Sequence, residues 1–439
     1  MAHYSDREAH IPFDRHHLIE LCLRDGKLPK RDREKFRQFC QLLSAYYHFH
    51  FHSIVEDLKD YYTPFNPYEK LSEFQSFTAT EQQQMEADFF NRFEQVLERA
   101  NYFPLSQETL EKAFAQRSLI ELKTDIDFKD FDRMLFYCQG DIYELITRKK
   151  WWFRTVTETL DIFERVVVAI KFKDESYFTE AENLKFTPGK IYLFYYQNVP
   201  KFDLEFLFPN VKVSMTWKDR LILIGSAIGA AIPLMIKILP QVVIIVGVIL
   251  FFTGTLPGME NMKADEEDVR NLTPALLATL SLLLAFGGFA FKQYNSYKNK
   301  KIKFQKKVTE TLFFKNLANN TSVFHALIDT AEEEECKEII LVYYHLLTSG
   351  KPMTPEDLDD RIESWMETTW NCQIDFDING PLKNLYNIRG RLNNMQGKPQ
   401  SDIPLLSYDE WGKCQVKSLD DSLEILDYLW DNAFRYSHG

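Results

Sequence analysis

Two apolar blocks in the middle of the chain constrain the fold more than any other feature of the sequence. Residues 221–254 contain a single charged side chain, Lys237, and residues 275–291 contain none. As a helix, the second block would be about 25 Å long, close to the roughly 30 Å of a bilayer's hydrocarbon core. We therefore expect residues 219–292 to form a membrane region that contains a transmembrane helical hairpin.

The first apolar block is too long for one straight span, because as a continuous helix it would measure about 51 Å. Pro233 and Pro240 interrupt the helical hydrogen bonding on either side of Lys237. A kinked span over about 221–254, followed by a second span over 273–291, is the simplest arrangement. Three crossings remain open if each half of the first block spans separately.

The charges that flank these blocks predict the topology. The loop over residues 255–272 is acidic, whereas residues 292–307 contain seven lysines. Lysine and arginine residues that flank a span stay on the cytoplasmic side, so we expect the polybasic segment 293–307 to be cytoplasmic. With two crossings, both termini are then in the cytoplasm. The N-terminal residues lack the apolar core of a secretory signal and are too acidic for a transit peptide. We therefore expect the first 200 residues to fold on the side of the membrane where they are made.

The membrane region and its flank supply the candidate site residues. Small residues spaced four apart favour close helix packing, either within the chain or in a homo-oligomer. Lys237 is a candidate intramembrane charge, or a lysine that extends toward the interface from a helix break. The lysines that follow the second span are candidates for contact with anionic membrane lipid, or serve only to set topology. The packing candidates are Gly225, Gly229, Gly287 and Gly288, and the lipid candidates are Lys298, Lys300, Lys301 and Lys303.

Residues 1–218 read as an α+β domain, with a helical head followed by an antiparallel sheet. A helical stripe follows Pro29, and Thr80 with Gln83 indicates the capping of a second helix. Later segments are rich in β-branched and aromatic residues, with a turn expected at Gly140. The stripe consists of Phe36, Phe39, Leu43, Tyr46, His50, Ile54 and Leu58, and the strand segments are 165–173, 190–196 and 211–217.

Histidines and cysteines give weak evidence for a metal. His48, His52 and Glu56 would share one face of a helix, a conceivable metal trio. His50, however, falls on the apolar stripe, where a core histidine is commoner, and we predict no metal. The six cysteines are too widely spaced for a zinc knuckle or a redox pair. They favour a reducing compartment, and no cofactor is predicted.

Residues 308–439 read as an acidic, winged-helix-like C-terminal domain with 11 basic and 23 acidic residues. Helices are expected up to Gly350, from Thr354-Pro355 and after Asn379, followed by two short extended segments and a last helix. The glutamates at 332–335 point in different directions on a helix, so we read them as a solvated face. The acidic charge disfavours nucleic acid and favours a basic protein partner.

No motif of a known catalytic class occurs in the sequence, including the P-loop, HExxH and GxSxG patterns. The leading hypothesis is therefore a membrane-anchored scaffold or regulator that presents two cytoplasmic domains. An oligomeric channel or transporter component is the first alternative, because the small-residue spacing allows the spans to associate. An uncharacterised membrane enzyme is the second alternative, since many active sites leave no linear motif.

Several long stretches resemble one family over about residues 4 to 430. They include HYSDREAHIPFDRHHLIELCL near the start, FRQFCQLLSAYYHFHFH, FERVVVAIKFKDESYF, GKIYLFYYQNVPKFDLEFLFP and KKVTETLFFKNLANNTSVFHALIDTAEEEECKEIILVYY. Together they resemble the transmembrane protein 143 family, a domain of unknown function in cyanobacteria, plants and animal organelles. The resemblance implies a membrane protein with two spans and supplies no catalytic residues. Together with the lack of a transit peptide, it implies a bacterial inner (plasma) membrane or a thylakoid membrane.

Overall fold

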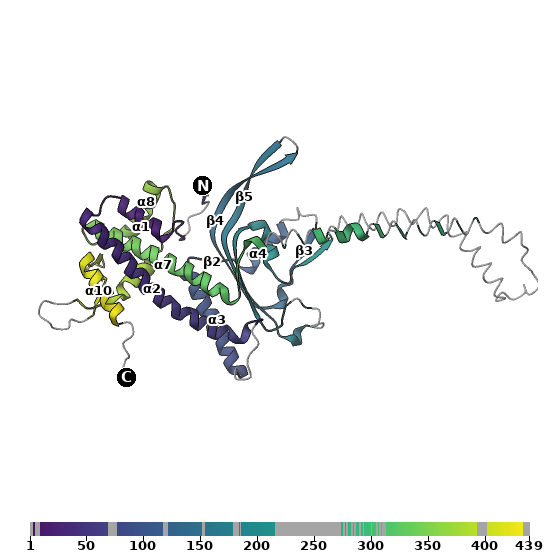
Figure 1. The fold of residues 1–439 in the computed structure, drawn as a ribbon, viewed down its shortest axis with the longest axis horizontal. Coiled ribbons are helices and arrows are strands. Elements are labelled where there is room, and N and C mark those ends of the chain that lie inside the picture. The colour runs from purple at the N-terminus through teal and green to yellow at the C-terminus, as the bar shows by residue number, and fades with distance from the viewer. Residues whose placement is uncertain are drawn as a thin grey trace, which may run out of the picture. The chain divides into compact units, whose positions relative to one another are not determined.

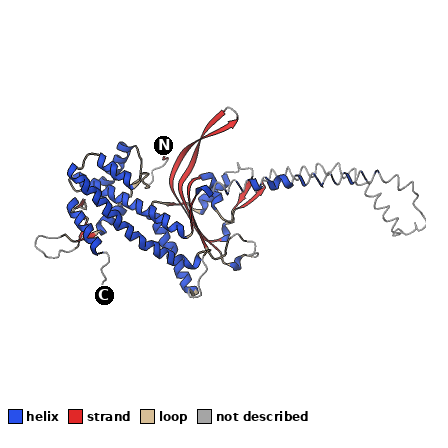
Figure 2. Ribbon diagram, in the orientation of Figure 1, coloured by secondary structure: helices blue, strands red, loops and turns tan. Residues whose placement is uncertain are grey.

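A computed structural model gives the fold of the chain (Figures 1 and 2). It describes residues 3–4, 9–68, 77–116, 122–151, 154–178, 184, 186–215, 313–392 and 402–432, and individual helical positions between 274 and 309. The chain forms two compact units. The first is built from residues 1–114, 127–209 and 315–439, and the second from residues 115–126 and 210–314.

An antiparallel six-stranded sheet is the framework of the first unit. Its strands contain the β-branched and aromatic segments that favour extended backbone, and the strands predicted over 165–173 and 190–196 are confirmed. Five of the strands follow one another across the sheet, and the sixth, β2 (Phe103–Pro104), pairs with β4 outside this order. That order is β1 (His3–Tyr4), β4 (Phe131–Trp151), β5 (Arg154–Phe172), β6 (Ile191–Pro200) and β8 (Asn316–Asn319).

Strands β4 and β5 form one long hairpin. Their pairing runs from Phe131 opposite Phe172 to Trp151 opposite Arg154. The turn that the sequence predicted at Gly140 is therefore wrong, because the strand continues through this residue. Gly140 still has the backbone of a turn glycine, with φ of +70°, and it lies inside the strand across from Glu164.

Helix α7 (Thr321–Ser349) is the centre of the helical layer that covers one face of the sheet (Figure 1). It contacts α1 (Arg15–Arg24), α2 (Arg33–Tyr62) and α3 (Ala79–Arg99). Buried rings join these helices: Phe39 stacks on Tyr343 at 3.9 Å between ring centroids, and Tyr62 meets Phe324 edge-on at 5.3 Å. Segments from the two ends of the sequence thus share one core.

The N-terminal helices follow the predicted pattern with local differences. The buried stripe of α2 passes through Tyr47 and Phe51, whereas the predicted His50 is exposed. The cap before α3 is a complete capping box between Thr78 and Glu81, two residues earlier than predicted. Helix α4 (Gln107–Gln116) follows Ser106 as expected.

The C-terminal elements have the predicted order. Gly350 ends α7 with φ of +66°, and the Thr354 hydroxyl accepts a hydrogen bond from the Asp357 backbone N–H at the start of the next helix. The predicted helices and the two-stranded pair are confirmed. The elements are α8 (Pro355–Trp370), α9 (Asn379–Asn387), β9 (Arg389–Gly390), β10 (Ile403–Pro404), β11 (Leu406–Tyr408), β12 (Cys414–Val416) and α10 (Leu419–Asn432).

The domain boundaries predicted after residues 218, 292 and 307 each touch residues that the structure does not describe. They stay predictions. In the second unit the structure describes an antiparallel pair, β3 (Leu122–Asp125) and β7 (Lys212–Met215), and helical positions from residue 274 onward.

The predicted membrane protein requires correction. Within the described part of the chain, no helix is both long enough and apolar enough to cross a bilayer. The transmembrane helical hairpin and the bacterial inner or thylakoid membrane location are therefore not supported, and the α+β description alone is retained. The expectation depended on apolar composition over residues 221–254, which lie outside the described residues, and over 273–291, which are described only in part.

Candidate functional site

Three of the four consecutive glutamates of α7 are buried in an ionic network, so the prediction of a solvated face is wrong. Glu332, Glu334 and Glu335 are each less than a tenth exposed. Arg15 pairs with Glu332 at 3.3 Å, and Arg99 forms a two-pronged contact with Glu335. Because consecutive residues leave a helix in different directions, the run meets more than one of the helices packed around α7. Arg15 of α1 contacts both Glu332 and Glu333, whereas Arg99 of α3 contacts Glu335.

Glu334 is the most enclosed of the four and has the most partners. Its Oε1 lies 2.7 Å from Lys337 Nζ and 2.9 Å from His10 Nδ1, and its Oε2 accepts the Ile11 backbone N–H. Lys337 Nζ also donates to the Ile11 carbonyl at 2.6 Å. Burial alone would raise the pKa of Glu334, but His10 and Lys337 outweigh burial and hold that pKa below its ordinary value.

The other nitrogen of His10 faces a second carboxylate. His10 Nε2 lies 3.8 Å from Glu164 Oε2, on strand β5. Glu164 can occupy this position because Gly140 has no side chain: a Cβ at Gly140 would lie 2.6 Å from Glu164 Oε2. Gly140 is therefore required both for its positive φ and for the path of the Glu164 side chain.

A polar row crosses three neighbouring strands at the end of the sheet's apolar face. Gln139, Arg165 and Gln197 are in register on β4, β5 and β6. Their α7-facing neighbours, Val167 and Tyr195, belong to the hydrophobic core. Arg165 therefore presents a guanidinium between two carboxamides at the point where the core ends.

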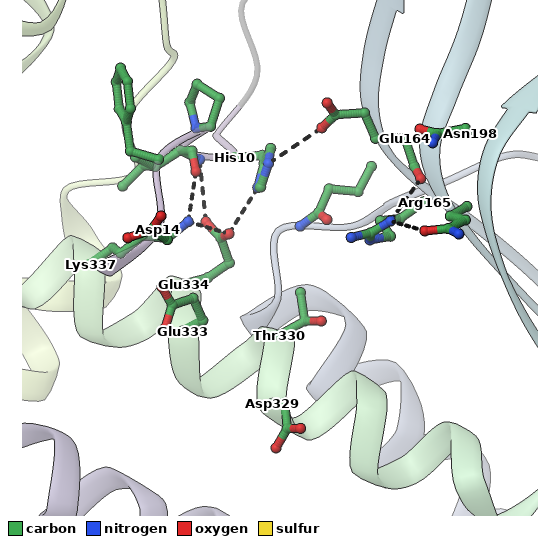
Figure 3. Close-up of a pocket in the computed structure, with 15 residues that line it drawn as sticks. His10, Asp14, Glu164, Arg165, Asn198, Asp329, Thr330, Glu333, Glu334 and Lys337 are labelled. Atoms are coloured by element: carbon green, nitrogen blue, oxygen red, sulfur yellow. Dashed lines mark hydrogen bonds and ion pairs between the residues drawn. The ribbon is translucent and has the colours of Figure 1, made fainter. Parts of the chain in front are cut away.

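These groups line one cleft of about 590 Å³, shown in Figure 3. The N-terminal segment 10–14 forms one wall, the polar row with Glu164 and Asn198 forms the second, and α7 forms the third. The α7 residues are Asp329, Thr330, Glu333, Glu334 and Lys337. The volume is in the range of small-molecule sites, which is roughly 300–1,000 Å³.

The charges in the cleft differ in how far they are neutralised. The Lys337 ammonium group donates hydrogen bonds to the Glu334 carboxylate, which neutralises its charge, and to the Ile11 carbonyl. Among the described residues, Arg165 forms no ion pair, and its hydrogen bonds reach Gln197 Oε1 at 3.4 Å and the Glu164 carbonyl at 3.5 Å. An unneutralised guanidinium beside carboxamides can bind a carboxylate, and the surrounding acids can bind an ammonium group.

The site residues predicted from the sequence lie elsewhere in the chain. Gly225, Gly229, Lys237 and Lys300 are outside the described residues. Gly287 and Gly288 are at exposed helical positions, where an added Cβ would meet nothing within 4 Å. Lys298 and Lys303 are exposed and Lys301 is half-buried. All of them belong to the second unit, and their predicted roles stay predictions.

The histidine cluster gains a partner that the sequence did not reveal. His48 and His52 on α2 line a small hollow of about 60 Å³ with His325, Asp329 and Glu332 from α7. His48 Nδ1 lies 2.9 Å from Glu332 Oε2. In the described part of the chain, no three His, Cys, Asp or Glu side chains are placed to hold a metal ion.

The residues of the cleft escaped the sequence analysis because no linear signal joins them. His10, Glu164 and Glu334 come from three distant segments. One usable signal was Arg165, the first residue of the apolar strand RVVVAIKFK. Alternate residues of a strand share a face, so Arg165 lies on the same face as the core residue Val167.

The comparisons with known proteins give a family match over part of the chain and no activity. A family described as a protein of unknown function (DUF3754) matches residues 163–322. This finding overturns the resemblance to the transmembrane protein 143 family. The match includes Glu164, Arg165 and Gln197 but neither Gln139 nor Glu334, so it covers the β5 and β6 part of the sheet wall of the cleft. No solved structure matches the chain.

Proposed function

We propose that this chain is a regulatory scaffold whose cleft binds a small zwitterionic molecule, with one carboxylate and one ammonium group. The observation that carries this proposal is Arg165, a guanidinium without an ion-pair partner among the described residues, in a cleft whose other lining is acidic. A ligand that pairs with both the guanidinium and the carboxylates must carry a negative and a positive group.

The carboxylate of the ligand is assigned to the polar row. The guanidinium of Arg165 can donate two parallel hydrogen bonds to a carboxylate. Its Nη1 already donates to two neutral oxygens, and its other N–H groups remain available to a ligand. Asn198 and Gln197 lie beside it and offer amide donors. These groups orient the ligand's acidic end against the sheet.

The ammonium group is assigned to the acidic lining. The lining contains five carboxylates against two cations, and one of those cations, Lys337, is already paired. Such a lining repels a ligand with anionic charge alone. Glu164, whose side chain is about a third exposed, is assigned to the cation, because it lines the cleft and its Oε2 lies 3.8 Å from His10 Nε2 on the opposite wall.

The test is calorimetric titration of the full chain with a mixture of free amino acids, followed by each amino acid alone. Binding is expected for a zwitterion and is expected to fail for its decarboxylated amine and its deaminated acid. Arg165→Gln removes the guanidinium and is expected to abolish binding, while Arg31→Gln, at a side chain 86 % exposed, leaves it unchanged. Equal binding of the deaminated acid would contradict the proposal.

Acid–base catalysis is a second candidate, favoured by the position of His10. Its Nδ1 contacts the buried carboxylate of Glu334, which leaves Nε2 toward Glu164 and the cleft. This is the geometry of a histidine oriented by a carboxylate for proton transfer. If the bound molecule is turned over, His10→Gln is expected to stop turnover and retain binding. A ligand recovered unchanged from the wild-type protein would contradict catalysis.

We further propose that the scaffold receives a basic protein segment on α8 and the loop that follows it. Exposed carboxylates gather there, including Asp360, Asp375 and Asp377. Partial burial, and then the repulsion of neighbouring carboxylates, raises the pKa of Asp359 to about 6. A dense negative potential of this kind attracts Lys- and Arg-rich chains.

The docking proposal is tested with a synthetic arginine-rich peptide and fluorescence anisotropy. Asp360→Lys with Asp375→Lys is expected to weaken binding, because the reversal removes the attraction. Asp402→Lys with Asp427→Lys is the matched control, since these exposed carboxylates lie outside α8 and its loop. Equal loss of affinity in both double variants would show that net charge alone is responsible.

A further inference from the structure

The face formed by α9 and the β11–β12 hairpin brings exposed aromatic side chains together. The ring centroids of Tyr386 on α9 and Tyr408 on β11 lie 6.0 Å apart, and the guanidinium carbon of Arg389 lies 4.4 Å from the centroid of the Tyr386 ring. Trp411, in the turn of the hairpin, is 79 % exposed. With the exposed lysines of the same elements, these residues form a surface that we call the wing face: Lys383, Tyr386, Arg389, Tyr408, Trp411 and Lys413.

The turn that presents Trp411 is held in one conformation. Asp409 Oδ1 accepts the backbone N–H groups of Trp411 and Lys413 at 2.9 and 2.8 Å, and Gly412 has a φ of +75°. A fixed turn loses little conformational freedom when its side chains are covered by a partner. The exposed indole is therefore well prepared for contact with another molecule.

The cations of the wing face have no carboxylate partner among the described residues. Lys383 and Lys413 form no ion pair there, and Arg389 donates from Nε to a backbone carbonyl. The turn also contains Asp409, which is engaged with the backbone, and Glu410. Three cations against these two carboxylates leave the face with a local positive charge.

The same chain presents the opposite charge on α8 and the loop that follows it. Asp360, Asp375 and Asp377 are exposed there, and we call them the acidic patch. Repulsion from all three contributes to the raised pKa of Asp359, so the carboxylates of the helix and of the loop share one surface. Helix α9, about 13 Å long, begins directly after this loop and ends in the wing face.

We infer that the wing face of one copy of this chain docks on the acidic patch of a second copy. The inference rests on the docking role proposed for α8 and names the partner. Each copy carries both surfaces close together in the chain, so one two-fold axis allows the contact to form twice. The opposite charges select the pairing, and the exposed tryptophan, tyrosines and arginine are the residue types that contribute most to protein–protein binding.

Single-stranded nucleic acid is the other anionic partner that suits aromatic and basic side chains. It is disfavoured here, because residues 308–439 contain 11 basic and 23 acidic residues and the acidic patch lies next to the wing face in the chain. Those carboxylates repel phosphates, whereas a second copy offers both signs of charge.

The test is sedimentation velocity of the full chain over a range of protein and salt concentrations. The wild type is expected to associate, and to associate less as salt is added, because exposed charges are screened. Lys383→Glu with Lys413→Glu is expected to weaken association by about tenfold or more, and so is Asp360→Lys with Asp375→Lys, since like charges then face each other. Trp411→Ala is expected to weaken association by about tenfold or more through lost contact area.

The two double variants also allow a test by mixing. One carries two basic surfaces and the other two acidic surfaces, so an equimolar mixture is expected to form heterodimers, which also shows that both variants are folded. The matched control is Lys30→Glu with Lys129→Glu, which reverses two charges at exposed lysines outside these elements. It is expected to retain the association of the wild type.

A monomeric wild type overturns the inference, as does association that both double variants retain or that the mixture fails to restore. Oligonucleotide binding that depends on Lys383 and Lys413, without self-association, also overturns it and assigns the wing face to nucleic acid. If a monomeric wild type still binds the arginine-rich peptide at α8, this inference fails and the docking proposal stands. If the peptide also fails to bind, both fail.

Discussion

His10 Nδ1 lies 2.9 Å from Glu334 Oε1, and this buried contact joins the N-terminal segment to the central helix α7. The two residues are far apart in the sequence, in the first and the last third of the chain. The same carboxylate receives Lys337 and the Ile11 backbone, so one side chain fixes the wall of the cleft to the helix. The cleft and the core therefore depend on the same ionic contacts.

Glu334→Gln is expected to lower the free energy of unfolding by about 3 kcal/mol, because it leaves the buried cation of Lys337 without a counter-charge. Lys337 is only 2 % exposed. The double variant Glu334→Leu/Lys337→Met removes both charges and is expected to lose less than Glu334→Gln. Urea denaturation measures both. Glu333→Gln, at a neighbouring half-buried side chain, is the control and is expected to lose about 1 kcal/mol or less.

Gly140→Ala is expected to destabilise the fold by roughly 2 kcal/mol, through both the positive φ and the contact with Glu164. Gly412→Ala separates the two causes, since Gly412 also has a positive φ, of +75°, but no heavy atom lies within 4 Å of an added Cβ. Thermal unfolding is expected to show a larger loss at Gly140 than at Gly412. Similar losses at both positions would contradict a role for Glu164.

Local signals in the sequence predicted most of the helices and strands. Thr354 before Pro355 and Gly350 after α7 identified helix ends, because capping and left-handed backbone depend on adjacent residues. The stripe of α2 was predicted correctly at both ends and slipped by one residue in the middle. Over a helix of 30 residues, a stripe assigned to His50 and one assigned to Phe51 differ by a single position.

The site could not be predicted in the same way. The run Glu332–Glu335 has the composition of a solvated surface, and its burial depends on Arg15 and Arg99, which are far away in sequence. The positive φ of Gly140 was anticipated as a turn, whereas long-range pairing with β5 makes it a position within a strand. The membrane prediction depended on apolar composition, on the flanking charges and on the family resemblance, and within the described residues no helix supports it.

Glu338→Gln is expected to stabilise the protein at alkaline pH. Burial, and then the nearby carboxylates Glu334 and Glu335, raises the pKa of Glu338 to about 8. Between the ordinary value of 4.5 and about 8, the unfolded chain has released a proton that the folded chain still holds. The wild type therefore loses stability as pH rises through this window, by up to about 1.4 kcal/mol per pH unit.

In the Glu338→Gln variant this loss is absent, and Gln can still accept the hydrogen bond that Asn101 donates. Urea denaturation at pH 5 and at pH 8.5 is expected to give a gain over the wild type that is larger at the higher pH, by up to about 4 kcal/mol. A gain that does not change with pH would show that Glu338 is already ionised in the folded protein.

His345 is expected to make the fold sensitive to acid. It is fully buried, and its Nδ1 accepts a hydrogen bond from Arg361 Nε at 3.3 Å. Burial, and then the charges of Arg361 and Lys27, lowers the pKa of His345 to about 3. Between the ordinary value of 6.5 and about 3, the unfolded chain binds a proton that the folded chain excludes. The free energy of unfolding therefore decreases as the pH is lowered through this window, by up to about 1.4 kcal/mol per pH unit.

His345→Gln retains an acceptor for Arg361 and removes the titrating group. Its free energy of unfolding, measured by urea between pH 4 and pH 6.5, is expected to depend less steeply on pH than that of the wild type. His16→Gln is the control, because His16 is exposed and its removal is expected to leave the wild-type slope. The wild-type slope in His345→Gln would mean that groups other than this buried imidazole cause the acid sensitivity.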